Sequence, residues 1–277
     1  MGLYFLVICR VGCLTGERIF FHYLGEKRNG LATTLVAFGG AAALLWIAAV
    51  CVGPIDLVGG AFWPSLIYAA HFALYTTAFG MGSVSTVSPW TNLTVLLLFL
   101  WAPAGGLLAW AGLGAFGIGM WLLVGRHPTH WTPVLAIVAA SLLLAVARLA
   151  DVGRSTGPAL AYAASMYTWV SLWIGIVVLV AGRTEEVAGL LRERPLWSLF
   201  SAGANAASYI TLVLLIRELP LAGLESLGSV AALAATLIGS FWLKEPAGKR
   251  KIMASWLMSG GALALLWDHL AHARLGL

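Results

Sequence analysis

The sequence predicts an all-α polytopic membrane protein with ten transmembrane helices arranged as two inverted five-helix repeats. Three observations lead to this prediction: an apolar fraction of 61% against 10% charged residues, ten separate apolar runs, and connections too short to hold a soluble domain. A soluble globular chain has roughly 45–50% apolar and about 25% charged residues. With a mean hydropathy of +0.92, the composition excludes an ordinary water-soluble enzyme, a disordered chain and a secreted disulfide scaffold.

The apolar runs set the number of predicted helices. A spanning helix needs about 20 mostly apolar residues, so a chain of 277 residues holds at most roughly ten to twelve spans. The runs lie at 3–23, 31–52, 61–82, 84–104, 105–124, 131–150, 158–182, 197–216, 220–243 and 252–270. The first run is the least regular, because Arg10, Glu17 and Arg18 interrupt it.

Ten spans divide into five plus five, residues 1–126 and residues 127–277. In each half the fourth span follows the third after a very short turn. An odd number of spans per repeat forces the second copy to insert upside down, and such inverted repeats place a transporter's substrate site at the midplane between the halves. Sequence identity between the halves is low, so the prediction of a duplication rests on rhythm and spacing alone.

Residues 219–266 carry the most informative pattern. A proline opens a helix of small residues, an acidic residue ends it, a basic turn follows, and the last span is rich in small residues. The residues in these places are Pro220, Ala231, Ala232, Ala234, Ala235, Lys244, Glu245, Lys249, Arg250, Lys251, Ser259, Gly260 and Gly261. This segment resembles the closing pair of helices in the EamA-type drug/metabolite transporter superfamily. The resemblance is weaker over 61–124 and 131–182, and residues 102–106 depart from it because no acidic residue follows the fourth span.

The resemblance implies a ten-helix exporter or exchanger of small metabolites that works by alternating access without ATP. It also implies that spans one, three, four, six, eight and nine line the cavity. The family carries amino acids, drugs, nucleotide sugars and related solutes, so the resemblance leaves the substrate open. The sequence has no G-x-x-x-x-G-K-[ST] loop, no catalytic constellation and no metal-ligand spacing around Cys9, Cys13 and Cys51. We therefore expect neither an enzyme nor a cofactor or metal site.

Charged residues inside the apolar runs are functional candidates, because a charge in hydrocarbon costs at least about 2.5–3.5 kcal/mol. Arg10 lies a third of the way into the first run, and Glu17 follows about two turns later on the same face. Arg10 either pairs with Glu17 or binds an anionic substrate. Glu225, near the start of the ninth run, is the candidate for binding a cationic amine or for proton coupling, and the alternative is an ion pair with Arg217.

Five uncharged side chains complete the predicted substrate site. His71 and Tyr75 lie four residues apart on the third span, Asn205 and Tyr209 lie four apart on the eighth, and Asn92 is near the middle of the fourth. Residues four apart share a helix face, and polar groups in a membrane usually face other helices. Each side chain by itself fits packing, but their joint occurrence predicts a common polar cavity.

Other residues are assigned to packing or to the membrane interface. Arg18 and His22 are expected to snorkel to the interface, and the cluster of Arg148, Asp151 and Arg154 is expected to anchor the end of the sixth run there. Arg148 and Asp151, three apart, are able to pair. Close helix packing is predicted at the small residues Gly112, Gly114, Gly117 and Gly119.

Lysine and arginine are concentrated on one side of the predicted topology. Only two loops are appreciably charged, 183–194 and 244–251. The odd-numbered loops contain Lys27, Arg28, Arg126, Arg183, Arg192, Arg194, Lys244, Lys249, Arg250 and Lys251, and the even loops and tail contain Arg148, Arg154, Arg217 and Arg274. The positive-inside rule therefore places the odd loops in the cytoplasm and both termini outside. The family resemblance implies the opposite arrangement, with both termini in the cytoplasm.

These observations predict a secondary active transporter of the cytoplasmic membrane that exports or exchanges a small polar or amphipathic metabolite. We expect it to be a monomer or weak homodimer that contacts membrane lipid and no nucleic acid. One alternative is a flippase or transporter of a lipid or lipid-linked sugar, whose anionic head group the arginines of the first and sixth spans would hold. Another is a non-transporting partner subunit with a solid centre, in which Asn92 and Asn205 bond to each other.

Overall fold

The computed structural model of the protein describes residues 2–52, 57–101, 106–124, 131–152, 158–219, 221–245 and 249–275, and these ranges contain helices and no β-strand. The long helices are α1 (Gly2–Gly25), α2 (Gly30–Val52), α3 (Phe62–Met81), α6 (Leu107–Val124), α7 (Trp131–Val152), α8 (Ala159–Val180), α10 (Pro195–Leu215), α11 (Leu221–Phe241) and α12 (Lys249–Leu275). The shorter ones are η1 (Gly59–Ala61), α4 (Val84–Val87), η2 (Ser88–Asn92), α5 (Leu93–Trp101) and α9 (Thr184–Glu193). Outside the described part lie Pro220, residues 102–105, Arg126, Arg154, the boundary between the predicted halves and the side chain of Arg274.

Six helical segments are long and apolar enough to cross a membrane: Gly30–Val52, Val84–Trp101, Trp131–Val152, Ala159–Val180, Pro195–Leu215 and Gly223–Phe241. The chain is therefore an all-helical polytopic membrane protein, as the composition predicts. The remaining predicted runs fall on α1, α3, α6 and α12. Helices α1, α3 and α12 pack against several of the six segments, and α6 packs against α12 and α5. Helix α1 is not among the six because of its charged residues. Every stretch of it that is long enough to cross a membrane contains Arg10, Glu17 and Arg18.

The predicted run at 84–104 is a helix that changes geometry in its middle. Helix α4 passes into the 3₁₀ turn η2 at Ser88, and α-helical geometry resumes at Leu93. Pro89 has no N–H to donate, so the regular helical hydrogen bond is missing at this position. The Thr91 hydroxyl donates to the Ser88 carbonyl oxygen (2.7 Å) within the turn. Asn92, which is 1% exposed, ends this turn, so the irregular backbone lies in the interior of the bundle.

The charged segment 183–194 is a helix, α9, where the sequence analysis expected a loop. Glu185 and Glu186 lie in its first turn and Arg192 in its last. Acidic side chains stabilise the positive N-terminal end of a helix dipole, and basic side chains stabilise its negative C-terminal end. This order of charges is the sequence signal that the segment is helical. Leu190 is buried, and α9 packs against α2 and α10.

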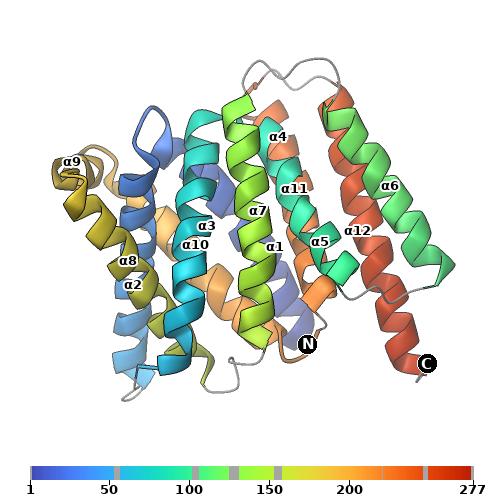
Figure 1. Ribbon diagram of the computed structural model, residues 1–277, viewed down its shortest axis with the longest axis horizontal. Coiled ribbons are helices and arrows are strands. Elements are labelled where there is room, and N and C mark those ends of the chain that lie inside the picture. Colours follow the sequence, from blue (N-terminus) through green and yellow to red (C-terminus); the bar gives the residue numbers. More distant parts are fainter. Residues whose placement is uncertain are drawn as a thin grey trace.

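Figure 1 shows α6 and α12 as a pair at one edge of the bundle and α2, α8 and α9 at the opposite edge. Both chain ends lie at one end of the bundle, and α9 lies at the other (Figure 1). The α6–α12 pair has a small apolar core of its own with α5, built on Val95, Phe99, Phe116, Met258 and Leu265. A larger core fills the rest of the bundle and surrounds the polar centre.

Glu245 connects the turn between α11 and α12 to the start of α4. Its two carboxylate oxygens accept the backbone N–H groups of Val84 and Ser85, each at 2.7 Å. Amides at the start of a helix have no partner within the helix, and a carboxylate satisfies them with charge-assisted hydrogen bonds. Gly239 permits this approach, because a Cβ there would lie 2.6 Å from Glu245 Oε2. The acidic residue of the 219–266 pattern therefore ties α11 and α12 to the fourth span.

Glycines bring the backbones of α6 and α12 into contact. A Cβ on Gly112 would lie 2.7 Å from the Gly261 carbonyl oxygen, and a Cβ on Gly119 would lie 2.9 Å from the Ala254 carbonyl oxygen. A Cβ on Gly114 or Gly117, in contrast, would meet nothing from another part of the described chain within 4 Å. One glycine of each predicted pair thus makes the close approach, and the two are seven residues apart on one face of α6.

We expect Gly261→Val to lower the free energy of unfolding by about 1–3 kcal/mol, because its side chain would overlap the backbone of α6. Gly260→Val is the matched control, since a Cβ at Gly260 meets nothing within 4 Å. Thermal unfolding of the two purified variants in detergent measures the difference. An equal loss of stability in both would contradict the backbone contact.

Candidate functional site

A polar cavity of about 60 Å³ lies in the interior of the bundle, with walls from α1, α3, η2, α7, α8, α10 and α11. Its volume leaves room for a few water-sized molecules, so the cavity is narrow in this conformation. The structure places all eight predicted site residues in its wall: Arg10, Glu17, His71, Tyr75, Asn92, Asn205, Tyr209 and Glu225. The wall also contains Arg18, Tyr167 and Ser208, which the sequence analysis did not select for the site, and Arg148, which it considered only for the lipid alternative.

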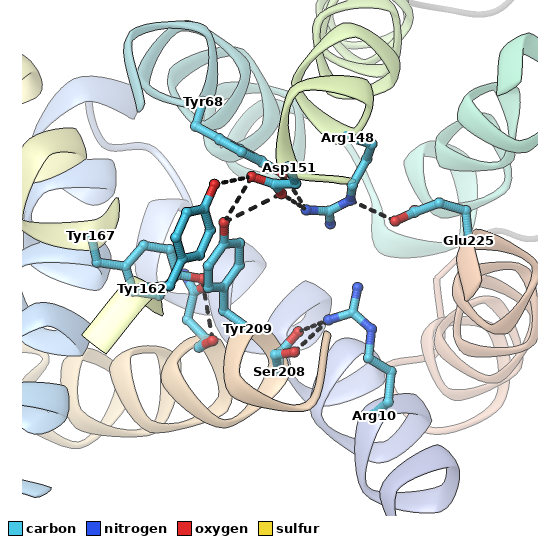
Figure 2. Close-up of polar contacts among 10 residues, drawn as sticks. Arg10, Tyr68, Arg148, Asp151, Tyr162, Tyr167, Ser208, Tyr209 and Glu225 are labelled. Atoms are coloured by element: carbon cyan, nitrogen blue, oxygen red, sulfur yellow. Dashed lines mark hydrogen bonds and ion pairs between the residues drawn. The ribbon is translucent and has the colours of Figure 1, made fainter. Parts of the chain in front are cut away.

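Arg148 is the centre of a buried ionic network (Figure 2). Its Nε donates to Glu225 Oε1 on α11 at 2.6 Å, and its Nη1 lies 3.6 Å from Asp151 Oδ2 on α7. Arg148 is 6% exposed and Asp151 is 1% exposed. The interfacial position predicted for these two residues is therefore wrong, whereas their pairing is confirmed.

Three tyrosines from three helices surround the Asp151 carboxylate. Tyr162 on α8 donates to Oδ1 at 2.7 Å, and Tyr68 on α3 donates to Oδ2 while accepting from Arg148 Nη1. The Tyr209 hydroxyl on α10 is 3.4 Å from Oδ2. A carboxylate removed from water needs such donors as well as its counter-charge. The network therefore joins α3, α8 and α10 to the Arg148–Glu225 pair of α7 and α11.

Arg10 and Glu17 lie in the same wall of α1 but do not form an ion pair. Arg10 Nη1 donates to the backbone oxygen and the hydroxyl of Ser208 at 2.5 and 2.9 Å. Figure 2 shows the Arg10 guanidinium pointing from α1 toward Arg148 and Glu225. No basic group in the described part of the chain comes within 4 Å of the Glu17 carboxylate. Of the two alternatives for Arg10, the structural pair with Glu17 is thus not formed.

Arg18 is buried in the cavity wall, at 4% exposure, so its predicted interfacial position is wrong. Its Nη1 and Nη2 donate to the Gly228 carbonyl oxygen on α11 at 3.2 Å, and Nη2 donates to the Thr91 hydroxyl at 2.9 Å. The signal was present in the sequence. Arg10, Glu17 and Arg18 follow the i, i+7, i+8 spacing of a single helix face, so the burial of one implies the burial of the others.

The uncharged residues of the wall are only partly satisfied. His71 Nδ1 carries a proton that it donates to the Ala140 carbonyl oxygen (2.8 Å), and the Tyr167 hydroxyl donates to Asn205 Oδ1 (2.6 Å). Both amide atoms of Asn92 and the Nδ2 of Asn205 find no hydrogen-bond partner among the described residues. A hydrogen bond between Asn92 and Asn205 is the contact expected of a purely structural subunit. The structure does not contain this bond.

A second hollow, of about 500 Å³, lies on the opposite face of α1, against α2 and α10. It is apolar and is lined by Gly12, Cys13, Gly16, Phe20, Leu44, Leu199, Phe200, Gly203 and Ala204. The charged side chains of α1 line the central cavity instead. Nothing in the described ranges groups three His, Cys, Asp or Glu residues as a metal site.

Comparison with known proteins identifies the fold and no family. Neither a protein-family model nor a curated protein matches the chain. A crystal structure described only as that of a protein is similar, with a TM-score of 0.65 and 15% sequence identity over 97% of this chain and 99% of that chain. The two chains therefore share their fold over almost their whole length.

We expect Asp151→Ala to lower the free energy of unfolding by about 3–5 kcal/mol, because it leaves buried donors and part of the Arg148 charge without a counter-charge. Glu186→Ala is the control, since Glu186 pairs with Arg183 at 3.1 Å where both side chains are more than 40% exposed. That exposed pair contributes about 0.2–1 kcal/mol. Thermal unfolding in detergent compares the variants, and similar losses would argue against the Asp151 network as a stabilising centre.

Proposed function

We propose that the protein is a secondary active transporter of the EamA type that exports or exchanges a small polar or amphipathic metabolite across the cytoplasmic membrane. In this proposal α1, α2, α3, the α4–α5 segment and α6 form one five-helix repeat, within residues 1–126. The helices α7, α8, α10, α11 and α12 form the second, inverted repeat, within residues 127–277. The protein acts as a monomer or weak homodimer.

The observation that carries the proposal is the shared polar cavity. Arginine and glutamate are rare inside membrane proteins, and where they occur they usually face a substrate or ion pathway. Here both proposed repeats contribute charges to one wall, Arg10, Glu17 and Arg18 from the first, Arg148 and Glu225 from the second. A site between inverted repeats is the arrangement in which alternating access operates.

Helix packing supports the proposed repeats. Helix α1, the first of one proposed repeat, packs along α10, the third of the other. Helix α7, the first of the second repeat, packs along α3, the third of the first, so the two contacts are equivalent. The two second helices, α2 and α8, contact each other, as do the two last helices, α6 and α12. A two-fold axis in the membrane plane relates contacts in this way.

Polar contacts join the helices toward both ends of the bundle. The Arg148 network includes Tyr68, Asp151 and Tyr162, which lie near those ends of their helices that share a side with the chain termini. Glu245 and its contacts with α4 lie at the opposite end. In the proposed cycle one set of contacts opens while the other holds, and protonation of Glu225 would weaken its attraction to Arg148.

Reconstituted proteoliposomes test the function. We expect saturable uptake of at least one labelled solute from a panel of amines, amino acids and nucleotide sugars, driven by an imposed proton gradient. Glu225→Gln should retain exchange between labelled and unlabelled solute but lose at least about tenfold of the gradient-driven uptake, because glutamine carries no titrating proton. The matched control is Glu218→Gln, at an exposed carboxylate beyond the end of α10.

Two outcomes of that experiment contradict the proposal. Normal gradient-driven uptake by Glu225→Gln across pH would remove Glu225 as the coupling residue. Absence of transport for every soluble solute, with movement of a labelled phospholipid between leaflets, would replace the metabolite with the lipid alternative.

We further propose that the basic end of the bundle faces the cytoplasm. Lys27, Arg28, Arg183, Arg192 and Lys244 all lie at or near that end, in the connections between α1 and α2, α8 and α10, and α11 and α12. Positive residues flanking membrane helices are retained on the cytoplasmic side. This orientation places both chain ends outside, against the arrangement that the family resemblance implies.

Cysteine labelling of intact cells tests the orientation, in a background in which Cys9, Cys13 and Cys51 are replaced by serine. We expect Gly2→Cys to react with a membrane-impermeant thiol reagent and Arg192→Cys to react only after the cells are permeabilised. Both positions are exposed on the protein surface. Labelling of Arg192→Cys in intact cells would reverse the orientation.

A further inference from the structure

The charges around the cavity sum to zero but are unevenly distributed. Three arginines, Arg10, Arg18 and Arg148, and two acids, Glu17 and Glu225, line the cavity, and a third acid, Asp151, pairs with Arg148. Two of these acids, Asp151 and Glu225, are held on the single guanidinium of Arg148. Arg10 and Arg18 are therefore left with Glu17 between them on α1, and it pairs with neither.

The hydrogen-bond partners of Arg10 and Arg18 are all neutral. Arg10 donates to Ser208, and Arg18 donates to the Gly228 carbonyl oxygen and to Thr91. The Nε atom of each arginine is buried and has no partner within the described ranges. Guanidinium groups prefer carboxylate or phosphate oxygens, to which they bind in a two-pronged geometry with Nε and a terminal nitrogen. Neither arginine has such a partner among the described residues.

The same part of the wall has more free donors than free acceptors. Among the described residues that line the cavity, the buried nitrogen atoms without a partner belong to Arg10, Arg18, Asn92 and Asn205, and the one buried oxygen without a partner is Asn92 Oδ1. These four side chains are at most 4% exposed. Unsatisfied buried donors are costly, and a ligand that supplies oxygen acceptors relieves the cost.

We propose that the cavity binds an oxyanion, a carboxylate or a phosphate, through the guanidinium groups of Arg10 and Arg18 and the side-chain amides of Asn92 and Asn205. This inference rests on the proposed transport function, whose substrate it assigns to the class of small organic anions. One negative charge balances the two arginines and Glu17. The Arg148 network is not part of the anion site, because its counter-charges come from the protein.

Thermal shift and equilibrium binding on the purified full chain in detergent test this assignment with four solutes of one carbon skeleton. Glycerate and glycerol 3-phosphate carry the anion, glycerol is neutral, and serinol is a cation. We expect at least one of the anions to bind and to raise the melting temperature, and glycerol and serinol to have no effect. Arg10→Gln and Arg18→Gln should each weaken anion binding by about tenfold to a hundredfold, the usual effect of losing a charge-assisted hydrogen bond. Arg192→Gln, at an exposed arginine of α9, is the control.

A variant of nearly unchanged shape guards against loss of the fold. Asn92→Asp places a carboxylate in the proposed subsite, so it should abolish the anion effect while the protein elutes as a single folded species. Equal shifts with glycerol and with both anions would overturn the proposal. Anion binding that persists unchanged in Arg10→Gln, Arg18→Gln and Asn92→Asp would also overturn it.

Further arms separate the source of the anion and the proposed function. A shift with dihexanoyl phosphatidic acid and none with glycerol 3-phosphate would support the oxyanion site and assign it to a lipid head group. Anion binding without any transport in proteoliposomes would contradict the transport proposal and leave the anion site in place. Transport of serinol without anion binding would contradict the anion site and leave the transport proposal in place.

Discussion

The structure depends on a guanidinium in the interior of an apolar bundle. Arg148 is 6% exposed and reaches only the narrow central cavity, so most of its charge must be balanced within the protein. Glu225 and Asp151 supply the balance, and Tyr68, with two other tyrosines, fixes the Asp151 carboxylate. Because these partners come from five helices, the network determines how close those helices lie and in which rotation about their axes. Apolar packing by itself leaves both quantities loosely defined in a membrane, where lipid competes equally for apolar side chains.

Much of the fold follows from the sequence, since apolar runs of membrane length are a strong signal. The helix boundaries are more difficult where the signal is local. Pro89 marks the change of geometry in the fourth span, and the acids before Arg192 mark α9, but both features lie inside segments that composition treats as uniform. Gly112 and Gly119 show why a small-residue pattern predicts packing without its register. Only the position of α12 decides which glycines touch a backbone.

The candidate site was partly predictable, and the reason lies in where each polar residue stands within its run. Arg10 and Glu17 interrupt an apolar run, so their burial follows from the cost of a charge in lipid. Arg148 and Asp151 lie close to the end of an apolar run. A charged residue there fits a position at the membrane interface as well as a buried one, so the sequence near it does not distinguish the two. Their burial depends on Tyr162 and other tyrosines distant along the chain.

Glu245 has a consequence for the order in which the protein assembles during synthesis. The carboxylate is separated by 161 residues from Val84, whose amide it accepts. At about 5–20 residues per second, the ribosome needs roughly ten to thirty seconds to extend the chain over this distance. During that interval the residues of α4 have been synthesised, but the backbone N–H groups of Val84 and Ser85 do not yet have the Glu245 carboxylate as their acceptor. The start of the fourth span therefore obtains its native hydrogen-bond acceptor only after nearly the whole chain has been synthesised.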